Sequence, residues 1–409
     1  MPDSDEWPLS VQQRAMLDVI GDRVDSHYVN VETFRIVGPL DVAALRRALS
    51  EVVHRHDMLR SAYPRGRDTY RLLPCSEELV DRILEVSDGW ADLADALAEG
   101  VRRGAAPMAL DDGPPLRLWL GRVDATHAVL VVTGHYVVFD GWSFTLFYAD
   151  LSAAYRRNRA GGAELSRPPQ YREFPFEAPA GALDGWTDMF DAPYKRCREL
   201  SGQVGSGWGP AAVLRQSWDT APRATELAAR SFRVTPYVVG IAAMLRALSD
   251  TLDDPQVIVG SAYAGRTSAD SANVIGFFAN TVFLYADLRE VSSTPELVRH
   301  VDGQLRSWLR HPRTQWQPLL EHYAATDTYV AKVAFHPDEF AQPTLTLDGT
   351  TTERLPAPAG ASARRPFELV AGYAHDSVTT ALTYREDVVT EATATGLLTR
   401  FADRLGEIV

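Results

Sequence analysis

Apolar residues in the first part of the chain recur with strand and helix periodicities in turn. After Asp41, whose side chain can cap a helix, apolar residues recur at intervals of three and four over residues 42–53, which predicts a helix. The preceding residues 28–37 have a pattern typical of a strand. The first predicted elements are thus a strand followed by a capped helix.

A second group of elements leads into the segment with the most distinctive chemistry. Residues 116–120 alternate between apolar and polar positions, as a half-buried strand does, whereas residues 128–132 are continuously apolar, as an interior strand is. The segment 134–143 follows directly. Residues 144–157 then have helical periodicity, and the glycines within residues 159–162 predict the end of that helix.

The middle of the chain separates these elements from a second series. Residues 166–223 are rich in Gly, Pro and isolated aromatic residues, with a short helical stretch at 186–200, which indicates a crossover. The second series contains predicted helices at residues 224–231, 236–248, 295–309 and 390–408, and predicted strands at residues 257–259, 280–284, 329–335 and 377–384. We therefore predict two α/β lobes, residues 1–165 and 224–409, joined by the irregular crossover.

Composition narrows the class of protein. A chain of 409 residues with 45% hydrophobic content can bury large cores, and its formal net charge of -13 repels phosphate backbones, so nucleic acid is not an expected partner. The two cysteines, Cys75 and Cys197, lack the spacing of a disulfide framework or a zinc site. No apolar run is long enough to span a bilayer, and the N-terminus lacks an apolar signal region. We expect a monomeric, cytoplasmic protein with no membrane partner.

Several short motifs are weak singly and specific together, because their order and spacing are fixed. They are Leu9-Ser10-Val11-Gln12-Gln13-Arg14, His54-Arg55-His56-Asp57-Met58-Leu59-Arg60-Ser61, Asp112-Gly113-Pro114-Pro115-Leu116-Arg117, Gln170-Tyr171-Arg172-Glu173-Phe174, Ala264-Gly265-Arg266 and Ile275-Gly276-Phe277-Phe278-Ala279-Asn280-Thr281. In this order they resemble the condensation domains of nonribosomal peptide synthetases over nearly the whole chain.

The resemblance implies two chloramphenicol-acetyltransferase-like lobes in a V-shaped pseudo-dimer with a central tunnel. Two carrier proteins would present an acyl donor and a nucleophilic acceptor on phosphopantetheine arms, and no metal or other cofactor is expected. Phe278, Asn280 and Ser261 are the tunnel candidates. The family's His-His-x-x-x-Asp-Gly motif would lie in the tunnel, and here it reads His135-Tyr136-x-x-x-Asp140-Gly141.

Tyr136 therefore stands where the family has its working histidine. Forming an amide or ester from a thioester requires an acceptor for the proton of the nucleophile. A phenol with an ordinary pKa of about 10 is neutral at physiological pH, so it donates a hydrogen bond but is a poor base. The substitution predicts that the general-base role is lost.

The other motif residues have structural as well as catalytic interpretations. The candidate catalytic set is Tyr136, His135, Asp140 and Gly141. Adjacent side chains of an extended segment point to opposite faces, so His135 is better explained as an interior histidine than as a substitute base. Asp140 is expected to brace the loop by pairing with an arginine, and the resemblance points to Arg266. Trp142 and Ser143 are expected to support the motif, with Ser143 as a helix cap.

A metal site has less support in the sequence than the catalytic motif. His54, His56 and Asp57 lie close in sequence, but they fall at the end of a predicted helix, within a motif that the resemblance makes structural.

Three functions are open, and the sequence favours the first of them. The first is a carrier-dependent acyltransferase with an atypical active site, because the residues around Tyr136 are retained. The second is an inactive condensation-like module that recruits a carrier protein or a tailoring enzyme. The third is a tunnel that catalyses another reaction on a carrier-bound intermediate. No residue of the sequence supports this function directly.

Overall fold

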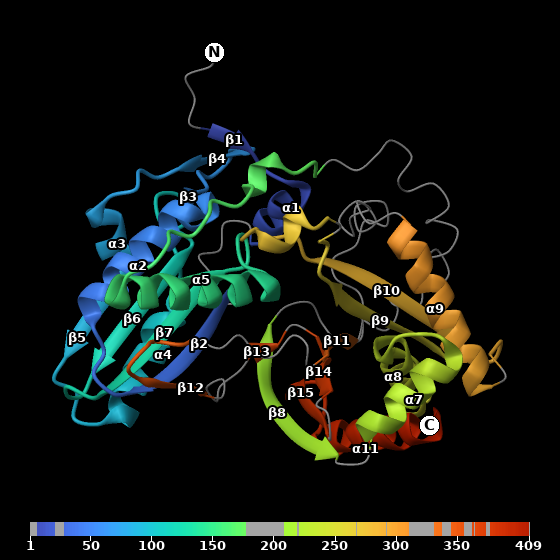
Figure 1. The fold of residues 1–409 in the computed structure, drawn as a ribbon. Helices are drawn as coiled ribbons and strands as arrows, with labels where there is room; N and C mark the ends of the chain where they lie inside the picture. Colours follow the sequence, from blue (N-terminus) through green and yellow to red (C-terminus); the bar gives the residue numbers. More distant parts are fainter. Residues whose placement is uncertain are drawn as a thin grey trace. The chain divides into compact units, whose positions relative to one another are not determined.

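The structure is a computed structural model, and it divides the chain into two lobes. It describes residues 6–20, 28–176, 208–218, 221–266, 268–291, 293–310, 331–337, 345–355, 362–363, 365–373 and 377–408. The N-terminal lobe consists of Met1–Glu177, Arg266–Ala279 and Gln342–Pro358, and the C-terminal lobe consists of Ala178–Gly265, Asn280–Ala341 and Ala359–Val409 (Figure 1). Each lobe is described by itself.

A five-stranded sheet forms the centre of the N-terminal lobe. Its order is β12 (Thr351–Leu355), β2 (Val29–Val37), β7 (His127–His135), β6 (Leu116–Arg122) and β5 (Leu84–Asp88). Only the β5–β6 pair is parallel among these neighbours. The strands predicted at residues 28–37, 116–120 and 128–132 are confirmed, and the continuously apolar β7 lies in the interior of the sheet.

Helices cover both faces of this sheet. On one face, α2 (Val42–Arg55) and α5 (Gly141–Ala160) pack with the strands into one apolar cluster, which α3 (Glu77–Ile83) joins at its edge. The predicted cap is present, since the side chain of Asp41 accepts a hydrogen bond from the N–H of Ala44 at 2.9 Å. The helix predicted at residues 144–157 is confirmed as α5, which ends at Gly161 with φ +79°.

The opposite face is covered by α4 (Leu93–Gly104), and this corrects the prediction of a half-buried strand at residues 116–120. Trp119, on the face expected to meet solvent, is only 1% exposed. Its ring packs against α4 at Gly100, where an added Cβ would lie 2.7 Å from Trp119 Cε3. Because a small residue of α4 allows this close approach, β6 is buried on both faces.

A smaller layer lies at the N-terminus. The strands β1 (Glu6–Pro8), β4 (Thr69–Leu72) and β3 (Ser61–Ala62) form a three-stranded antiparallel sheet. The helix α1 (Val11–Ile20) and the short 3₁₀ turns η2 (Asp57–Arg60) and η3 (Tyr171–Glu173) complete this layer (Figure 1).

The C-terminal lobe is built around a seven-stranded mixed sheet. Its order is β10 (Asn280–Asp287), β9 (Gln256–Tyr263), β11 (Ala331–Pro337), β14 (Phe367–Tyr373), β15 (Val378–Arg385), β8 (Gly209–Trp218) and β13 (Ser362–Ala363). One apolar cluster joins this sheet to α7 (Ala221–Phe232), α8 (Pro236–Leu252), α9 (Thr294–Arg310) and α11 (Glu391–Ile408). The helices and strands predicted for the second series are confirmed within the described residues, whereas the helix predicted at residues 186–200 lies outside them.

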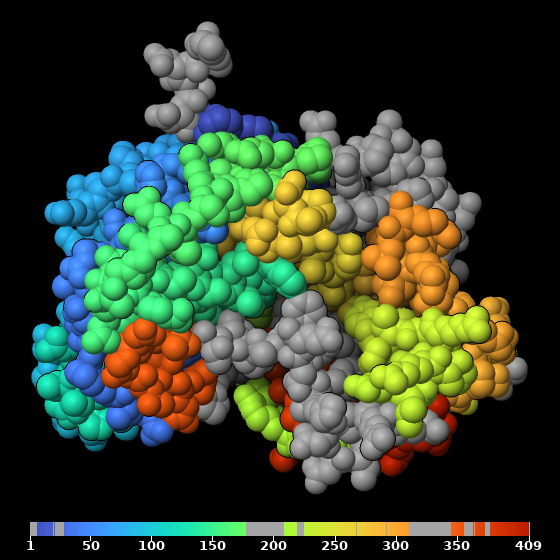
Figure 2. Space-filling view, viewed as in Figure 1, coloured from blue at the N-terminus to red at the C-terminus, as the bar shows by residue number. Residues whose placement is uncertain are grey.

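The observed lobes differ from the predicted boundaries in two respects. The strand β8 lies inside the predicted crossover, yet eight of its residues, 211–218, pair with β15 in the C-terminal sheet. The segments Arg266–Ala279 and Gln342–Pro358, expected in the second lobe, belong to the first. In Figure 2 the orange surface of residues 345–355 lies against the green surface of α5, and the N–H of Thr346 donates to Ser152 Oγ at 2.9 Å.

We expect the substitution Gly100→Ala to destabilise the protein, because the new Cβ would lie 2.6 Å from Val131 Cγ2 as well as against Trp119. Overpacking of this kind costs about 1–3 kcal/mol. Thermal unfolding followed by circular dichroism measures the effect as a lower melting temperature.

Gly303→Ala is the matched control, since Gly303 is also a helix-interior glycine but nothing lies within 4 Å of its added Cβ. It should raise the stability by up to about 1 kcal/mol. Equal melting temperatures for the two variants would contradict the packing described for α4.

Candidate functional site

The motif occupies the corner between β7 and α5. The strand ends at His135, and its carbonyl accepts hydrogen bonds from the N–H groups of Val138 at 3.0 Å and Phe139 at 2.9 Å. Tyr136 is therefore the first residue of a turn, and the expectation of an extended segment at this point is wrong. The conclusion that the two side chains differ in environment still holds: His135 is buried, while Tyr136 is half-buried.

His135 is held as a neutral interior side chain. Its Nδ1 accepts a hydrogen bond from the N–H of Val137 at 3.0 Å, which places the proton of the neutral ring on Nε2. Burial lowers its pKa to about 4. A ring with this pKa and with its acceptor nitrogen already occupied is a poor base at physiological pH.

Asp140 is the N-cap of α5 and is occupied on both carboxylate oxygens. Oδ1 accepts from the N–H of Ser143 at 2.8 Å, and Arg266 Nη2 lies 3.0 Å from Oδ1 and 3.1 Å from Oδ2. Oδ2 also accepts from the N–H of Phe278 at 3.2 Å. The side chains of Asp140 and Arg266 are 4% and 5% exposed, so the pairing expected from the resemblance is present as a buried ion pair.

Arg266 extends this contact to the rest of the Arg266–Ala279 segment. Its Nη1 donates to the carbonyls of Ser271 and Val274, and its guanidinium lies 4.5 Å from the centre of the Phe278 ring. Trp142 Nε1 donates to the carbonyl of Ala272 at 2.8 Å. Arg266 and Trp142 thus fix this segment to the first turn of α5, as their assignment to motif support requires.

Ser143 has a different role from the one predicted. Asp140, not Ser143, caps α5, and Ser143 is a fully buried residue in the first turn. Its Oγ lies 2.7 Å from Asp140 Oδ1, accepts from the N–H of Gly276 at 3.1 Å and lies 3.0 Å from the carbonyl of Gly276. The hydroxyl joins the helix to the Arg266–Ala279 segment. Gly141 precedes it as the first residue of α5, and an added Cβ there would meet nothing within 4 Å.

Ser10 and Gln13 form a capping box that sequence reasoning treated only as a family segment. Ser10 Oγ accepts from the N–H of Gln13, and Gln13 Oε1 accepts from the N–H of Ser10, both at 3.1 Å. Gln13 Nε2 also lies 3.4 Å from the carbonyl of Val137 in the motif turn. Ser10 Oγ is 2.8 Å from Tyr171 Oη, which donates to the carbonyl of Phe277 at 2.7 Å. The Ser-x-x-Gln spacing was the signal that could have identified this network.

The tunnel candidates divide between the lobes. Phe278 belongs to the N-terminal lobe and is 5% exposed, whereas Ser261 and Asn280 lie on the paired strands β9 and β10 of the C-terminal lobe and are 0% and 6% exposed. Their assignment to a tunnel stays a prediction.

The suggested metal residues have other partners. His54 is exposed, His56 Nε2 lies 2.6 Å from Asp150 Oδ2, and Asp57 is bound by arginines. Within the described part of the chain, no group of three or more His, Cys, Asp or Glu side chains is arranged to hold a metal ion.

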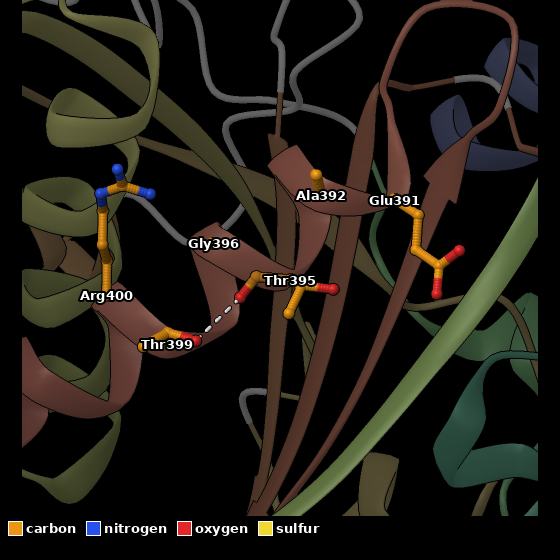
Figure 3. A pocket seen from close by; sticks show the side chains of 6 residues that line it. All are labelled: Glu391, Ala392, Thr395, Gly396, Thr399 and Arg400. Carbon is orange, nitrogen blue, oxygen red and sulfur yellow. Dashed lines mark hydrogen bonds between the residues drawn. The ribbon is translucent and has the colours of Figure 1, made fainter.

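A surface pocket lies on the C-terminal lobe and contains no motif residue. It is lined by one face of α11, at Glu391, Ala392, Thr395, Gly396, Thr399 and Arg400. Figure 3 shows the side chains of Glu391 and Arg400 at opposite ends of this row, with Thr399 Oγ1 bonded to the carbonyl of Thr395 at 3.1 Å. Because the charged groups do not converge, the pocket is not a candidate active site.

The sequence profile of the condensation domain matches residues 3–177 and 215–409. The chain belongs to the condensation domain family. It is 31% identical over 330 residues to the isonitrile lipopeptide synthase of Mycobacterium tuberculosis, covering 73% of this chain and 13% of the synthase. It is 27% identical over 336 residues to surfactin synthase subunit 2 of Bacillus subtilis, covering 77% of this chain and 9% of that subunit. This condensation domain therefore spans a small part of the curated relatives it matches.

Solved structures share the fold of this condensation domain. The X-domain from teicoplanin biosynthesis matches with a TM-score of 0.77 at 22% identity, covering 100% of this chain and 95% of that one. The first condensation domain of the CDA synthetase matches with a TM-score of 0.70 at 21% identity, covering 98% and 96% of the two chains. The predicted chloramphenicol-acetyltransferase-like lobes and the nonribosomal peptide context are confirmed. Among the described helices, none is long and apolar enough to cross a membrane.

We expect Arg266→Gln to destabilise the protein strongly, because it leaves Asp140 buried without its cation. Removing one partner of a buried ion pair costs about 3–5 kcal/mol. Urea unfolding measures this loss, and the double variant Asp140→Asn/Arg266→Gln should recover part of it.

The control is Arg306→Gln, which breaks an ion pair on α9 in which the arginine side chain is 64% exposed. Such a pair contributes about 1 kcal/mol or less. A loss for Arg266→Gln no larger than that for Arg306→Gln would show that the buried pair does not stabilise the lobe.

His135 should make stability fall as the pH falls. Because burial lowers its pKa from 6.5 to about 4, the unfolded chain binds a proton between these values that the folded chain does not. The neutral, buried His135 therefore contributes fully to the unfolding free energy above pH 6.5. This contribution is lost as the pH falls towards 4, and the total loss is about 3 kcal/mol. His135→Asn, which keeps an acceptor for the Val137 N–H, should have a shallower dependence of unfolding free energy on pH between 4 and 6.5. Parallel curves for the variant and the original protein would contradict the assignment.

Proposed function

We propose that this condensation domain is a recruitment module of nonribosomal peptide biosynthesis, which binds a carrier protein or a tailoring enzyme and does not itself form the new bond. The observation that carries the proposal is that the described motif residues offer no available base. His135 is neutral, with Nδ1 occupied, and Asp140 is saturated by Arg266, Ser143 and Phe278.

The chemistry of the remaining motif residue supports the same conclusion. Tyr136 offers a phenol, which donates a hydrogen bond at physiological pH but does not remove a proton from an amine or a hydroxyl. Its N–H donates to the carbonyl of Tyr28 at 2.9 Å, a contact that any residue except proline would make there. The turn is therefore preserved without a histidine at position 136.

A solved complex supports the class of partner. The X-domain from teicoplanin biosynthesis, which shares this fold, has been solved in complex with OxyB, and that X-domain chain matches with a TM-score of 0.77 at 21% identity. By analogy, a tailoring enzyme is one candidate partner for this domain. A carrier protein with its phosphopantetheine arm is the other, because the condensation domain relatives are parts of nonribosomal peptide synthetases.

Acyl transfer is the second candidate function, and the half-buried position of Tyr136 favours it. Losing general-base assistance costs about 10²–10⁴ in rate, while holding two substrates together supplies an effective molarity of about 10⁵–10⁸ M. A hydrogen bond from the phenol to the developing oxyanion would then be the chemical contribution of Tyr136.

Tyr136 variants distinguish the two functions. We expect the unaltered domain, supplied with the loaded carrier proteins of its own assembly line, to form no product above background. We expect it to form a complex with a carrier protein or tailoring enzyme whose dissociation constant is unchanged by Tyr136→Phe, because binding does not require the phenol oxygen. Mass spectrometry of the carrier-bound species and calorimetry measure the two outcomes.

Tyr136→His serves as the positive control for catalysis. Product formed by the unaltered domain and abolished by Tyr136→Phe would establish acyl transfer instead. The lack of a complex with any of these partners would count against recruitment.

A further inference from the structure

Asp57 pairs with more arginine side chains than are needed to neutralise its buried carboxylate. Its carboxylate is 1% exposed and pairs with Arg60, whose Nη2 lies 2.6 Å from Oδ1. Arg172 binds the other oxygen, and Arg167 Nη2 approaches it at 3.4 Å. One guanidinium compensates a buried carboxylate, so these three arginines, here called the Asp57 cluster, carry two more positive charges than the carboxylate they share.

Other arginines of this layer are balanced one to one. Arg14 pairs with Asp68, Arg65 with Asp111 and Arg71 with Asp112. The Asp57 cluster differs from them because its excess charge is local, in a chain whose net charge is -13. An excess of one sign at one place on the surface attracts a group of the opposite sign.

The cluster reaches the surface beside an exposed aromatic ring. Arg167 is 60% exposed, whereas Arg60 and Arg172 are 18% and 20% exposed. The guanidinium of Arg172 lies 4.5 Å from the centre of the Trp7 ring, and Trp7 is 36% exposed on β1. Figure 1 shows η3, in green, next to β1. Tryptophan and arginine are the residues most often found at the energetic centres of protein interfaces.

A buried polar group lies close to the cluster. The hydroxyl of Tyr70 is buried and has no hydrogen-bond partner within the described residues, and its ring centre lies 5.8 Å from that of Tyr63. Burial raises the pKa of this hydroxyl, and the charges of Arg172 and Asp57 act on it in opposite directions. Tyr63 and Tyr70 are 3% and 1% exposed, so the side chains next to the cluster are packed in the interior of the lobe.

We propose that the Asp57 cluster and Trp7 form a docking surface for an acidic segment of a partner protein. The exposed guanidinium of Arg167 would pair with a carboxylate of that segment, and Trp7 would contact an apolar side chain beside it. A protein segment fits better than a free anion, because an aromatic ring at the rim gives a small anion nothing to bind. This proposal rests on the proposed function in one respect: the acidic segment is taken to belong to the protein that the domain recruits.

Arg167→Glu tests the surface directly, because this side chain is the most exposed of the cluster and its contact with Asp57 is the longest. The probe is a fluorescein-labelled peptide of alternating glutamate and leucine, whose binding to the full chain is followed by fluorescence anisotropy at low and high salt. We expect salt-sensitive binding that weakens about tenfold or more in Arg167→Glu, since a like charge then faces the peptide. Trp7→Ala should weaken it as well.

Arg306→Glu is the matched control. Arg306 is 64% exposed and pairs with Asp302 on α9 of the C-terminal lobe, so it has the same charge and exposure as Arg167 without the cluster. The peptide affinity of this variant should stay within about twofold of that of the unaltered protein, because an isolated surface charge has a weak effect. Equal losses in the two variants, or no binding of the peptide, would overturn the docking surface.

The same variants separate this proposal from the proposed function. A carrier protein or tailoring enzyme that binds the domain equally well in Arg167→Glu would overturn the docking surface and leave recruitment intact. Peptide binding that depends on Arg167, without a complex with either partner, would support the surface and count against recruitment by this domain.

Discussion

The buried ion pair between Asp140 and Arg266 organises the N-terminal lobe around the motif. Arg266 belongs to a segment that leaves the C-terminal sheet after β9 and returns to it at β10, so the pair fixes this excursion to the start of α5. Both side chains are almost completely removed from water, which is costly for a charge that has no partner of opposite sign. Ser143 and the N–H of Phe278 complete the arrangement around the carboxylate. The aspartate therefore has a structural role whether or not the domain catalyses a reaction.

A second network holds the same segment. The capping box of Ser10 and Gln13 joins the carbonyl of Val137 to Tyr171, and Tyr171 in turn donates to the carbonyl of Phe277. Tyr171 also lies so close to Gly276 that an added Cβ would be 2.1 Å from its Cδ2. The Gly276–Phe278 stretch thus contacts α5 and η3 directly and is linked to the start of α1 through Tyr171. These contacts explain why the motifs occur together although they are distant in sequence. Each motif contributes a residue to the same buried hydrogen-bond network.

The sequence predicted the local elements well and the long-range ones poorly. The cap at Asp41 and the apolar run of β7 depend on neighbouring residues, so both could be read from the chain. The burial of Trp119 depends on packing against α4, and the place of β8 in the C-terminal sheet depends on pairing with β15. The place of residues 342–358 in the N-terminal lobe depends on pairing between β12 and β2. None of these partners is adjacent in sequence. The contact between Asp140 and Arg266 could be anticipated only through the resemblance, because 126 residues separate them.

Position 136 is where the requirements of folding and of chemistry can be separated. The turn is closed by backbone groups: the carbonyl of His135 accepts from Val138 and Phe139, and the N–H of Tyr136 donates to Tyr28. Neither contact depends on which side chain position 136 carries. His135 and Asp140, by contrast, use their side chains to hold the corner together. A tyrosine can therefore replace the histidine of the family motif while the corner is kept. The backbone of this corner therefore sets no requirement for a histidine at position 136, so the fold around the motif and the chemistry of that side chain can vary independently.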